Sequence, residues 1–333
     1  MKARLHYLYQ KFLVNRAVVL MYHRIATPES DIWDIAVSPS NFEQQLTFLK
    51  RHFNVIPLSE LAEVVARKKI KRKTVSITFD DGYVDNYVTA KPLLEKYGLP
   101  ATFFIASGNI GQETPFWWDE LEQLILFAEM LPQVFSLPFY ENGGKTDLKE
   151  ESFLSPELRL KHTTWKACEV EPPTLRAHLY YSLWQQLKPL PYQEQQARMK
   201  LIREWAGHVV THPELKSMSV DQLKNLGSNL LEIGTHTVTH PALAFHDVAF
   251  QKQEIFENRK CLQEITGQEA NLIAYPYGNY NEDTLNSVAS LNFKAAFTTE
   301  ERPINKQAHQ YRLGRYQVKN LPFHESSSIF NQW

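Results

Sequence analysis

Short apolar runs alternate along the chain with segments in which apolar residues recur at helical spacing. Runs this short, bounded by polar or turn residues, favour buried β-strands over helices. The predicted strands cover residues 17–22, 74–79, 101–106, 230–234, 272–275 and 294–299. A regular succession of strand, helix and strand indicates a parallel sheet, either open or closed into a barrel.

The segments between the strands carry helix signals. The stretch 38–52 has a proline near its first turn and an apolar face at helical spacing. Ser219 and Gln222 have the spacing of a capping box, which predicts a helix start. Residues 247–266 carry one apolar stripe, and Gly267 is placed to end that helix.

One long region lacks the strand pattern. Between about residues 112 and 216 only helical patterns occur, joined by proline-rich or polar loops, and strands resume afterwards. We therefore predict a helical insertion at 112–216 within a single barrel formed by 17–111 and 217–322. A short helix in 1–16 and a tail at 323–333 complete the expected organisation.

Composition narrows the classes of protein without identifying one. The 333 residues are 43% apolar, enough for a sizeable core, and the net charge of −1 gives no indication of a nucleic-acid partner. Cys168 and Cys261 lack CxxC spacing, which fits a reducing compartment or a protein that needs no disulfide. No apolar run is long enough to span a membrane.

The first sixteen residues mix basic and apolar side chains without a small-residue cleavage site. A helix packed on the domain is the favoured interpretation, and an amphipathic helix that lies on the membrane surface is the alternative. We expect a cytoplasmic protein, with contact at the inner membrane surface through this segment as an option.

Titratable side chains follow several predicted strands. His23 follows the first strand, Asp80 and Asp81 follow the second, and His236 and His240 come after the fourth. Because active sites of parallel sheets and barrels lie at the carboxyl ends of their strands, these residues are expected to converge. This convergence is the strongest sequence argument for a catalytic site.

The two histidines, four residues apart, face the same way if their segment makes one helical turn, which Pro241 would end. Two imidazoles and one carboxylate form a three-ligand set with positions open to water, as catalytic zinc sites have. Two surface histidines give the same spacing, but an aspartate pair at another strand end strengthens the metal hypothesis.

The motifs TFDDG, HTVTH and YPYG, in this order, resemble the NodB-homology polysaccharide deacetylases (carbohydrate esterase family 4). The opening VLMYHRI with SPSNFEQQLTFLKRH resembles members whose chain begins one strand earlier. The resemblance covers about residues 17–318, and the helical insertion is its least typical part. It implies a deformed (β/α)7 barrel that hydrolyses an N-acetyl or O-acetyl group on a sugar.

The resemblance also implies roles for individual residues. One divalent metal ion is expected, zinc first, with cobalt, nickel or manganese as alternatives. Its ligands would be Asp81, His236 and His240. Asp80 would be the general base, and the backbone N–H of Tyr277, flanked by Pro276 and Gly278, would face the substrate. Consecutive side chains at a strand end can then point apart, one to the cation and one to the attacking water.

Two positions depart from the family pattern. Many members carry an arginine in the third motif, where this chain has Ala274; Arg315 could supply the guanidinium, although a surface ion pair explains it equally well. Many members also take their general acid from a late histidine motif, which YRLGRY lacks. His23 is the predicted substitute, with a histidine satisfied in the core as the alternative.

Aromatic residues at the start of the insertion suggest sugar contacts. Trp117 and Trp118 could stack on sugar rings and Asp119 could contact hydroxyls, whereas core packing of at least one tryptophan is the competing interpretation.

The leading hypothesis is a metal-dependent hydrolase that deacetylates an amino sugar in a glycan or glycolipid precursor, in bacterial surface polysaccharide biosynthesis. The first alternative is a deformylase of a lipid-linked or nucleotide-linked formamido sugar. The second is a catalytically silent carbohydrate-binding barrel.

Overall fold

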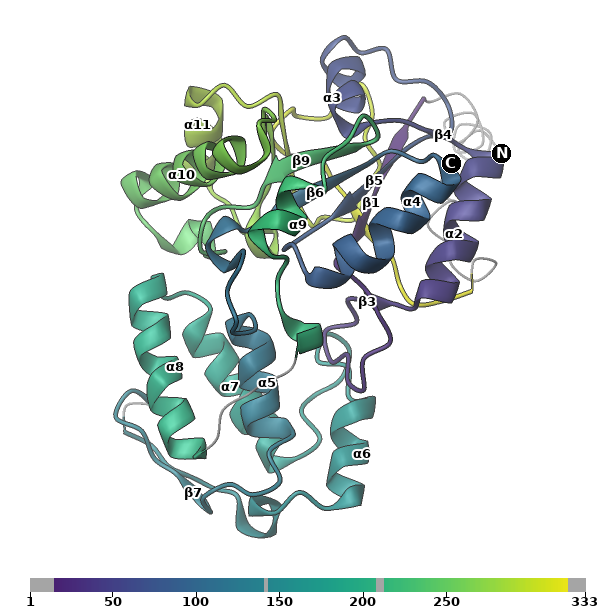
Figure 1. Cartoon of the computed structure of the whole chain (residues 1–333). Coiled ribbons are helices and arrows are strands. Elements are labelled where there is room, and N and C mark those ends of the chain that lie inside the picture. Colours follow the sequence, from purple (N-terminus) through teal and green to yellow (C-terminus); the bar gives the residue numbers. More distant parts are fainter. Residues whose placement is uncertain (1–14, 141–142, 208–212, 323–333) are drawn as a thin grey trace, which may run out of the picture. The chain divides into compact units, whose positions relative to one another are not determined.

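The computed structural model describes residues 15–140, 143–207 and 213–322 (Figure 1). The predicted tail at 323–333 lies outside the described residues, as does the predicted N-terminal helix except for residues 15 and 16. The chain divides into two compact units. The described part of unit 1 comprises residues 15–27, 35–110 and 218–322, and that of unit 2 comprises 28–34, 111–140, 143–207 and 213–217. The sequence pattern gives no sign that the stretch 28–34 belongs with unit 2.

Unit 1 is built on seven parallel strands that form a curled half-barrel with helices around it. In spatial order they are β11 (Ala295–Phe297), β10 (Leu272–Ala274), β9 (Leu231–Thr235), β6 (Ala101–Ile105), β5 (Thr74–Phe79), β1 (Ala17–Tyr22) and β12 (Tyr316–Gln317). The short strand β4 (Asn54–Val55) also pairs with β5. The deformed barrel expected from the sequence is confirmed.

The strands follow the apolar runs closely. β1 and β5 have the expected bounds, and each is buried at every position, as parallel strands covered on both faces are. The other four predicted strands differ from the observed ones by one or two residues, two of them at one end and two at both ends. β12 was not predicted, because two residues are too few to show a periodicity.

Two helices of unit 1 carry the caps predicted from the sequence, at Ser219 and Gly267, and a third has a cap that was not predicted. Ser38 caps α2 (Pro39–His52), a capping box opens α9 (Val220–Lys224), and α10 (Val248–Thr266) ends at Gly267 in the left-handed conformation. Unit 1 also contains α3 (Leu58–Ala66), the π-helix η1 (Asn86–Ala90), α4 (Lys91–Tyr97), α11 (Glu282–Ser290) and short 3₁₀ helices.

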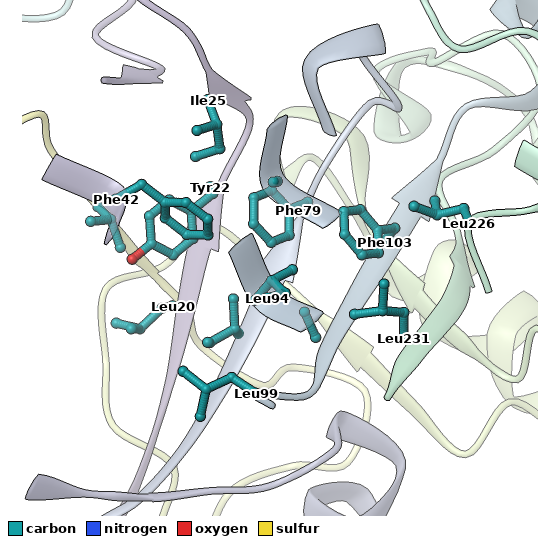
Figure 2. Close-up of a cluster of buried hydrophobic side chains, with 14 of the residues drawn as sticks. Leu20, Tyr22, Ile25, Phe42, Phe79, Leu94, Leu99, Phe103, Leu226 and Leu231 are labelled. Atoms are coloured by element: carbon teal, nitrogen blue, oxygen red, sulfur yellow. The ribbon is translucent and has the colours of Figure 1, made fainter. Parts of the chain in front are cut away.

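Alternation along the strands separates two apolar layers. One layer packs β1 and β5 against α2 and α4, and its centre is a row of rings (Figure 2). Phe79 lies between Tyr22 and Phe103, with ring centroids 5.3 and 4.7 Å away. The other layer contains Val19 and Phe104 from the opposite strand faces, together with the apolar side of α3.

Unit 2 is mainly helical, with α5 (Trp117–Leu126), α6 (Pro156–Thr164), α7 (Leu175–Leu187), α8 (Tyr192–Ala206) and a small hairpin of β7 (Val134–Phe135) and β8 (Thr146–Asp147). Buried polar side chains connect the segments of its interior through hydrogen bonds. Arg176 is fully buried and donates to four backbone carbonyls. His162 bridges Leu126 O and Thr174 Oγ1, and burial lowers its pKa to about 4, so its ring is neutral.

Among the helices of the described residues, none combines the length and the apolar stretch that crossing a bilayer would require. The cytoplasmic location and the contact of the N-terminal segment with the membrane surface stay predictions.

The ring row should dominate the stability of unit 1. Phe103→Ala leaves a cavity beside Phe79, and we expect it to lower the free energy of unfolding by about 3–5 kcal/mol, measured by urea denaturation. Phe245→Ala is the matched control, because that side chain is 63% exposed, and its effect should stay within about 0.5 kcal/mol. Equal effects of the two variants would contradict the packing described here.

Candidate metal and catalytic site

The polar residues that follow the strands of unit 1 lie at the carboxyl ends of neighbouring strands. β1 leads directly to His23, β5 to Asp80 and Asp81, and β9 to His236. In the sheet, β5 pairs with β1 on one side and with β6 on the other, and β6 pairs with β9. The parallel topology therefore gathers side chains that are more than 200 residues apart in sequence.

Three of these side chains form a compact set of metal-ligating atoms. One ligand atom each from Asp81, His236 and His240 lies within 4.8 Å of the others, and all three residues are buried. The Nε2 atoms of His236 and His240 lie 3.4 and 3.2 Å from Oδ1 of Asp81. Two imidazoles and a carboxylate facing one point are a donor set that suits zinc and similar divalent ions.

The histidines converge by a different route from the predicted one. Residues 236–240, all of which the structure describes, form no helical turn. Instead the backbone is left-handed at Thr237 (φ 64°) and at His240 (φ 57°). The helical-turn prediction was therefore wrong. Left-handed backbone is rare and costly at a β-branched residue such as Thr237, and the spacing of the two histidines gives no sign of it.

A backbone carbonyl sets the orientation of His236. Its Nδ1 lies 2.8 Å from the carbonyl oxygen of Ala274, at the end of β10. With Nδ1 held at this carbonyl, Nε2 is the ring nitrogen that faces Asp81, an orientation that metal-bound histidines adopt.

The two adjacent aspartates point to different partners. Asp80 continues the pattern of β5, since its N–H donates to Tyr22 O at 2.9 Å. Asp81 then adopts a left-handed conformation (φ 74°), followed by Gly82 at φ 96°. The turn sends one carboxylate toward the histidines and the other toward Arg315.

Arg315 is completely buried and pairs with both oxygens of Asp80, at 2.6 and 2.7 Å. The guanidinium also donates to Thr298 O and Thr78 Oγ1. This burial excludes the alternative of a surface ion pair. A fork-on-fork pair of this kind fixes the plane of the carboxylate as well as its charge.

The position of Arg315 follows from the last described segment of the chain. Leu313 hydrogen-bonds to Ala296 in β11, and Tyr316 then pairs with Leu20 in β1. The segment therefore crosses from one edge of the open sheet to the other, and Arg315 sits midway. The sequence motifs identified Arg315 as a candidate, but only this crossing segment brings its side chain to Asp80.

Electrostatics keep both aspartates charged. Burial alone would raise the pKa of Asp80, but Arg315, with smaller contributions from His236 and His23, holds it below its usual value. Burial likewise opposes ionisation of Asp81, and hydrogen bonds from His236 and His240 hold its pKa well below the usual range. Burial lowers the pKa of His240 despite Asp81, which favours the neutral, metal-binding imidazole.

His23 is half-buried at the end of β1 and close enough to both aspartates to contribute to their pKa shifts. Its carbonyl accepts a 2.8 Å hydrogen bond from Asn86. Next to it Arg24 pairs with Asp85 at 3.1 Å, which anchors the end of β1 to η1.

The third motif forms a tight turn beside the histidines. Tyr277 lies in the 3₁₀ turn η7 (Pro276–Gly278) with φ 56°, and its ring packs edge-on against His240 at 4.5 Å. Gly278 is required there, since its φ is +64° and a Cβ atom would lie 2.1 Å from Thr299 Oγ1.

Trp117, Trp118 and Asp119 lie in α5 of unit 2 and are each at most 8% exposed. Trp118 stacks on Phe116 at 4.6 Å, and the two tryptophan rings meet edge-on at 5.7 Å. The packing interpretation therefore describes both tryptophans in this structure. The sugar-contact role stays a prediction.

Sequence reasoning missed the residues that hold the histidine loop. Glu254 and Asn258 are buried on α10 and hydrogen-bond to the backbone of the segment 236–239. The available signal was their position on the inward side of α10, near the apolar Ile255 and Leu262, where a polar residue needs a partner.

Comparison with known proteins gives the family. The family model "Polysaccharide deacetylase" matches residues 67–126 and 194–296. The poly-beta-1,6-N-acetyl-D-glucosamine N-deacetylase of Staphylococcus aureus (strain MRSA252) is 34% identical over 327 residues, which cover 94% of this chain and 82% of that protein. The chain belongs to the polysaccharide deacetylase family.

Solved structures share the fold. IcaB from Ammonifex degensii superposes with a TM-score of 0.58 at 19% identity, covering 96% of this chain and 97% of that one. The deacetylase PplD of Streptococcus pyogenes, in complex with acetate, gives a TM-score of 0.56 at 20% identity, covering 92% and 94%.

The Asp80–Arg315 pair predicts a pH-dependent loss of stability. Arg315→Met leaves a buried carboxylate without its cation, and we expect a loss of about 3–5 kcal/mol near neutral pH. In the native protein the lowered pKa of Asp80 stabilises the fold above the unfolded value near 3.9, and this gain disappears as pH falls through the folded value. In the variant burial raises the pKa, so the loss should shrink toward pH 4.

Urea denaturation of both proteins at pH 7 and pH 4 measures this difference. The double variant Asp80→Asn with Arg315→Met removes both charges and should recover part of the lost stability. A loss of equal size at both pH values would argue against Asp80 as its source.

Proposed function

We propose that this protein is a metal-dependent hydrolase that removes N-acetyl groups from amino sugars of a glycan, in the synthesis of a bacterial surface polysaccharide. The observation that carries the proposal is the buried Asp81, His236 and His240 cluster with the Asp80–Arg315 pair beside it. Membership of the polysaccharide deacetylase family supports the reaction class. The substrate class rests on the Staphylococcus aureus relative, which is named for poly-beta-1,6-N-acetyl-D-glucosamine.

The donor set fits a divalent ion. His236 presents Nε2 because Ala274 occupies its Nδ1, and Asp81 is held as a carboxylate. An ion bound there would polarise the acyl carbonyl and lower the pKa of a water molecule. Zinc is our first choice, since nitrogen and carboxylate ligands with open positions are typical of catalytic zinc sites.

Asp80 is proposed as the general base. It must be ionised to accept a proton from water, and Arg315 maintains that state while fixing both carboxylate oxygens. Each oxygen retains a second lone-pair direction for water. The guanidinium thus orients the base and keeps its pKa low enough for ionisation at neutral pH.

His23 is proposed to act on the leaving amine, and Tyr277 on the oxyanion that develops at the acyl group. The backbone N–H of Tyr277, in the turn against His240, is assigned to the oxyanion that forms on the acyl oxygen. His23, near both aspartates at the end of β1, is assigned to protonate the leaving amine.

A purely carbohydrate-binding barrel explains the site less well. Binding a sugar requires neither a buried base nor a fully buried arginine that keeps it charged, and burying both without a catalytic use would cost desolvation energy. The base–arginine pair therefore favours the hydrolase.

Replacement of the base should separate turnover from metal binding. We expect Asp80→Asn to lower kcat by about 10²–10⁴-fold, because the amide that replaces the Asp80 carboxylate cannot accept the proton, while zinc binding stays within a few-fold of the native protein. Acetate release from N-acetylglucosamine oligomers and zinc titration measure the two effects. Retention of native activity would exclude the proposed mechanism, and faster release of formate from N-formyl oligomers would favour the deformylase.

The role of His23 predicts a dependence on the leaving group. An amine must be protonated as it departs, whereas 4-nitrophenolate leaves without a proton. We expect His23→Gln to lower kcat on an N-acetylglucosamine oligomer by about 10²-fold or more and to change hydrolysis of 4-nitrophenyl acetate far less. Equal losses on both substrates would contradict an acid role for His23.

A further inference from the structure

The segment between the two histidines needs an external restraint. Thr237 and His240 both have left-handed backbone, a costly conformation for residues other than glycine that persists only where surrounding contacts impose it. The side chains that supply these contacts come from α10, which Figure 1 shows beside β9.

Glu254 supplies three hydrogen bonds to the middle of this segment. Its Oε2 accepts from the backbone N–H groups of Val238 and Thr239 at 2.9 and 2.8 Å, and its Oε1 accepts from Thr239 Oγ1 at 2.9 Å. One carboxylate therefore fixes two consecutive peptide groups that lie between the two histidines.

Asn258, one turn further along α10, holds the beginning of the segment. Its Oδ1 accepts from the N–H of His236 at 3.1 Å, while its Nδ2 donates to Ile105 O at 3.0 Å and to Ser107 Oγ at 2.9 Å. The amide thereby ties the backbone of His236 to the end of β6.

Stability alone is a poor reason to keep Glu254. It is only 8% exposed, and the described part of the chain gives it no lysine or arginine partner. Burial raises its pKa despite the hydrogen bonds that it accepts. An isolated buried carboxylate is costly, so a local geometric role is the simpler explanation.

We propose that Glu254 and Asn258 are positioning residues that hold His236 and His240 at metal-binding separation before an ion arrives. This inference rests on the proposed function, since it takes the histidines as metal ligands. Neither residue is assigned contact with substrate or reacting atoms. Their action is through the backbone, because the separation of the two Nε2 atoms depends on the conformation of the four peptide groups between them.

The test is zinc affinity, measured by titrating metal-free protein in competition with a chromogenic chelator. Glu254→Gln keeps the size of the side chain but removes the negative charge that faces the two backbone N–H groups and replaces one acceptor oxygen by an NH₂ group, so the three present hydrogen bonds cannot all be kept as they are. We expect affinity for zinc to fall about 10–100-fold, the range found when groups that orient metal ligands are removed. Glu257→Gln, at an exposed position of the same helix, should bind zinc as the native protein does.

Hydrogen exchange gives a second readout that a general loss of stability would not reproduce. In Glu254→Gln the amides of Val238 and Thr239 should exchange faster, while those of β5 and β6 keep their native rates. If Glu254→Gln fails to fold, Thr239→Val decides, because it removes one of the three hydrogen bonds and keeps the side-chain shape; we expect a loss of affinity of about threefold or more.

The outcomes separate the two proposals. Native zinc affinity in Glu254→Gln, or in Thr239→Val when the first variant does not fold, overturns the positioning role and leaves the proposed function intact. Failure of the native protein to bind zinc, cobalt, nickel or manganese overturns the proposed function itself.

Discussion

The site depends on keeping two adjacent carboxylates charged in a buried place. Each one has a separate compensation: Asp80 has the Arg315 guanidinium, and Asp81 has two imidazoles. The left-handed turn at Asp81 makes this division possible, because it sends the two side chains to different partners. Without that separation the carboxylates would compete for one cation, and one of them would be protonated. The chemistry proposed for the chain requires both to be ionised.

The parts that sequence predicts well are those set by local pattern. Fully buried parallel strands must be nearly continuous apolar runs, so β1 and β5 were visible residue by residue. Caps gave helix ends in the same way, at Ser219 and at Gly267, since each satisfies the backbone groups of its own helix. The arrangement of motifs after strands then indicated which side chains would share one edge of the sheet.

What sequence could not supply was set by contacts distant along the chain. The left-handed backbone at Thr237 and His240 could not be predicted, because neither position is a glycine. Hydrogen bonds from α10 hold this segment. The burial of Arg315 depends on a two-residue strand joined to β1, which leaves no periodic trace. The stretch 28–34 belongs to unit 2 through contacts such as Trp33 with Tyr180, which lie 147 residues apart.

The pairing of β1 with β12 has a consequence for the order in which the site is completed during synthesis. Because Arg315 directly precedes β12, a nascent chain that ends before this strand contains Asp80, Asp81 and both histidines but lacks the counter-charge of Asp80. Synthesis therefore produces the two histidines and both aspartates before the guanidinium that balances the charge of Asp80. The charge balance of the site is thus completed by contacts between segments far apart in the chain, which is the kind of contact that forms slowly.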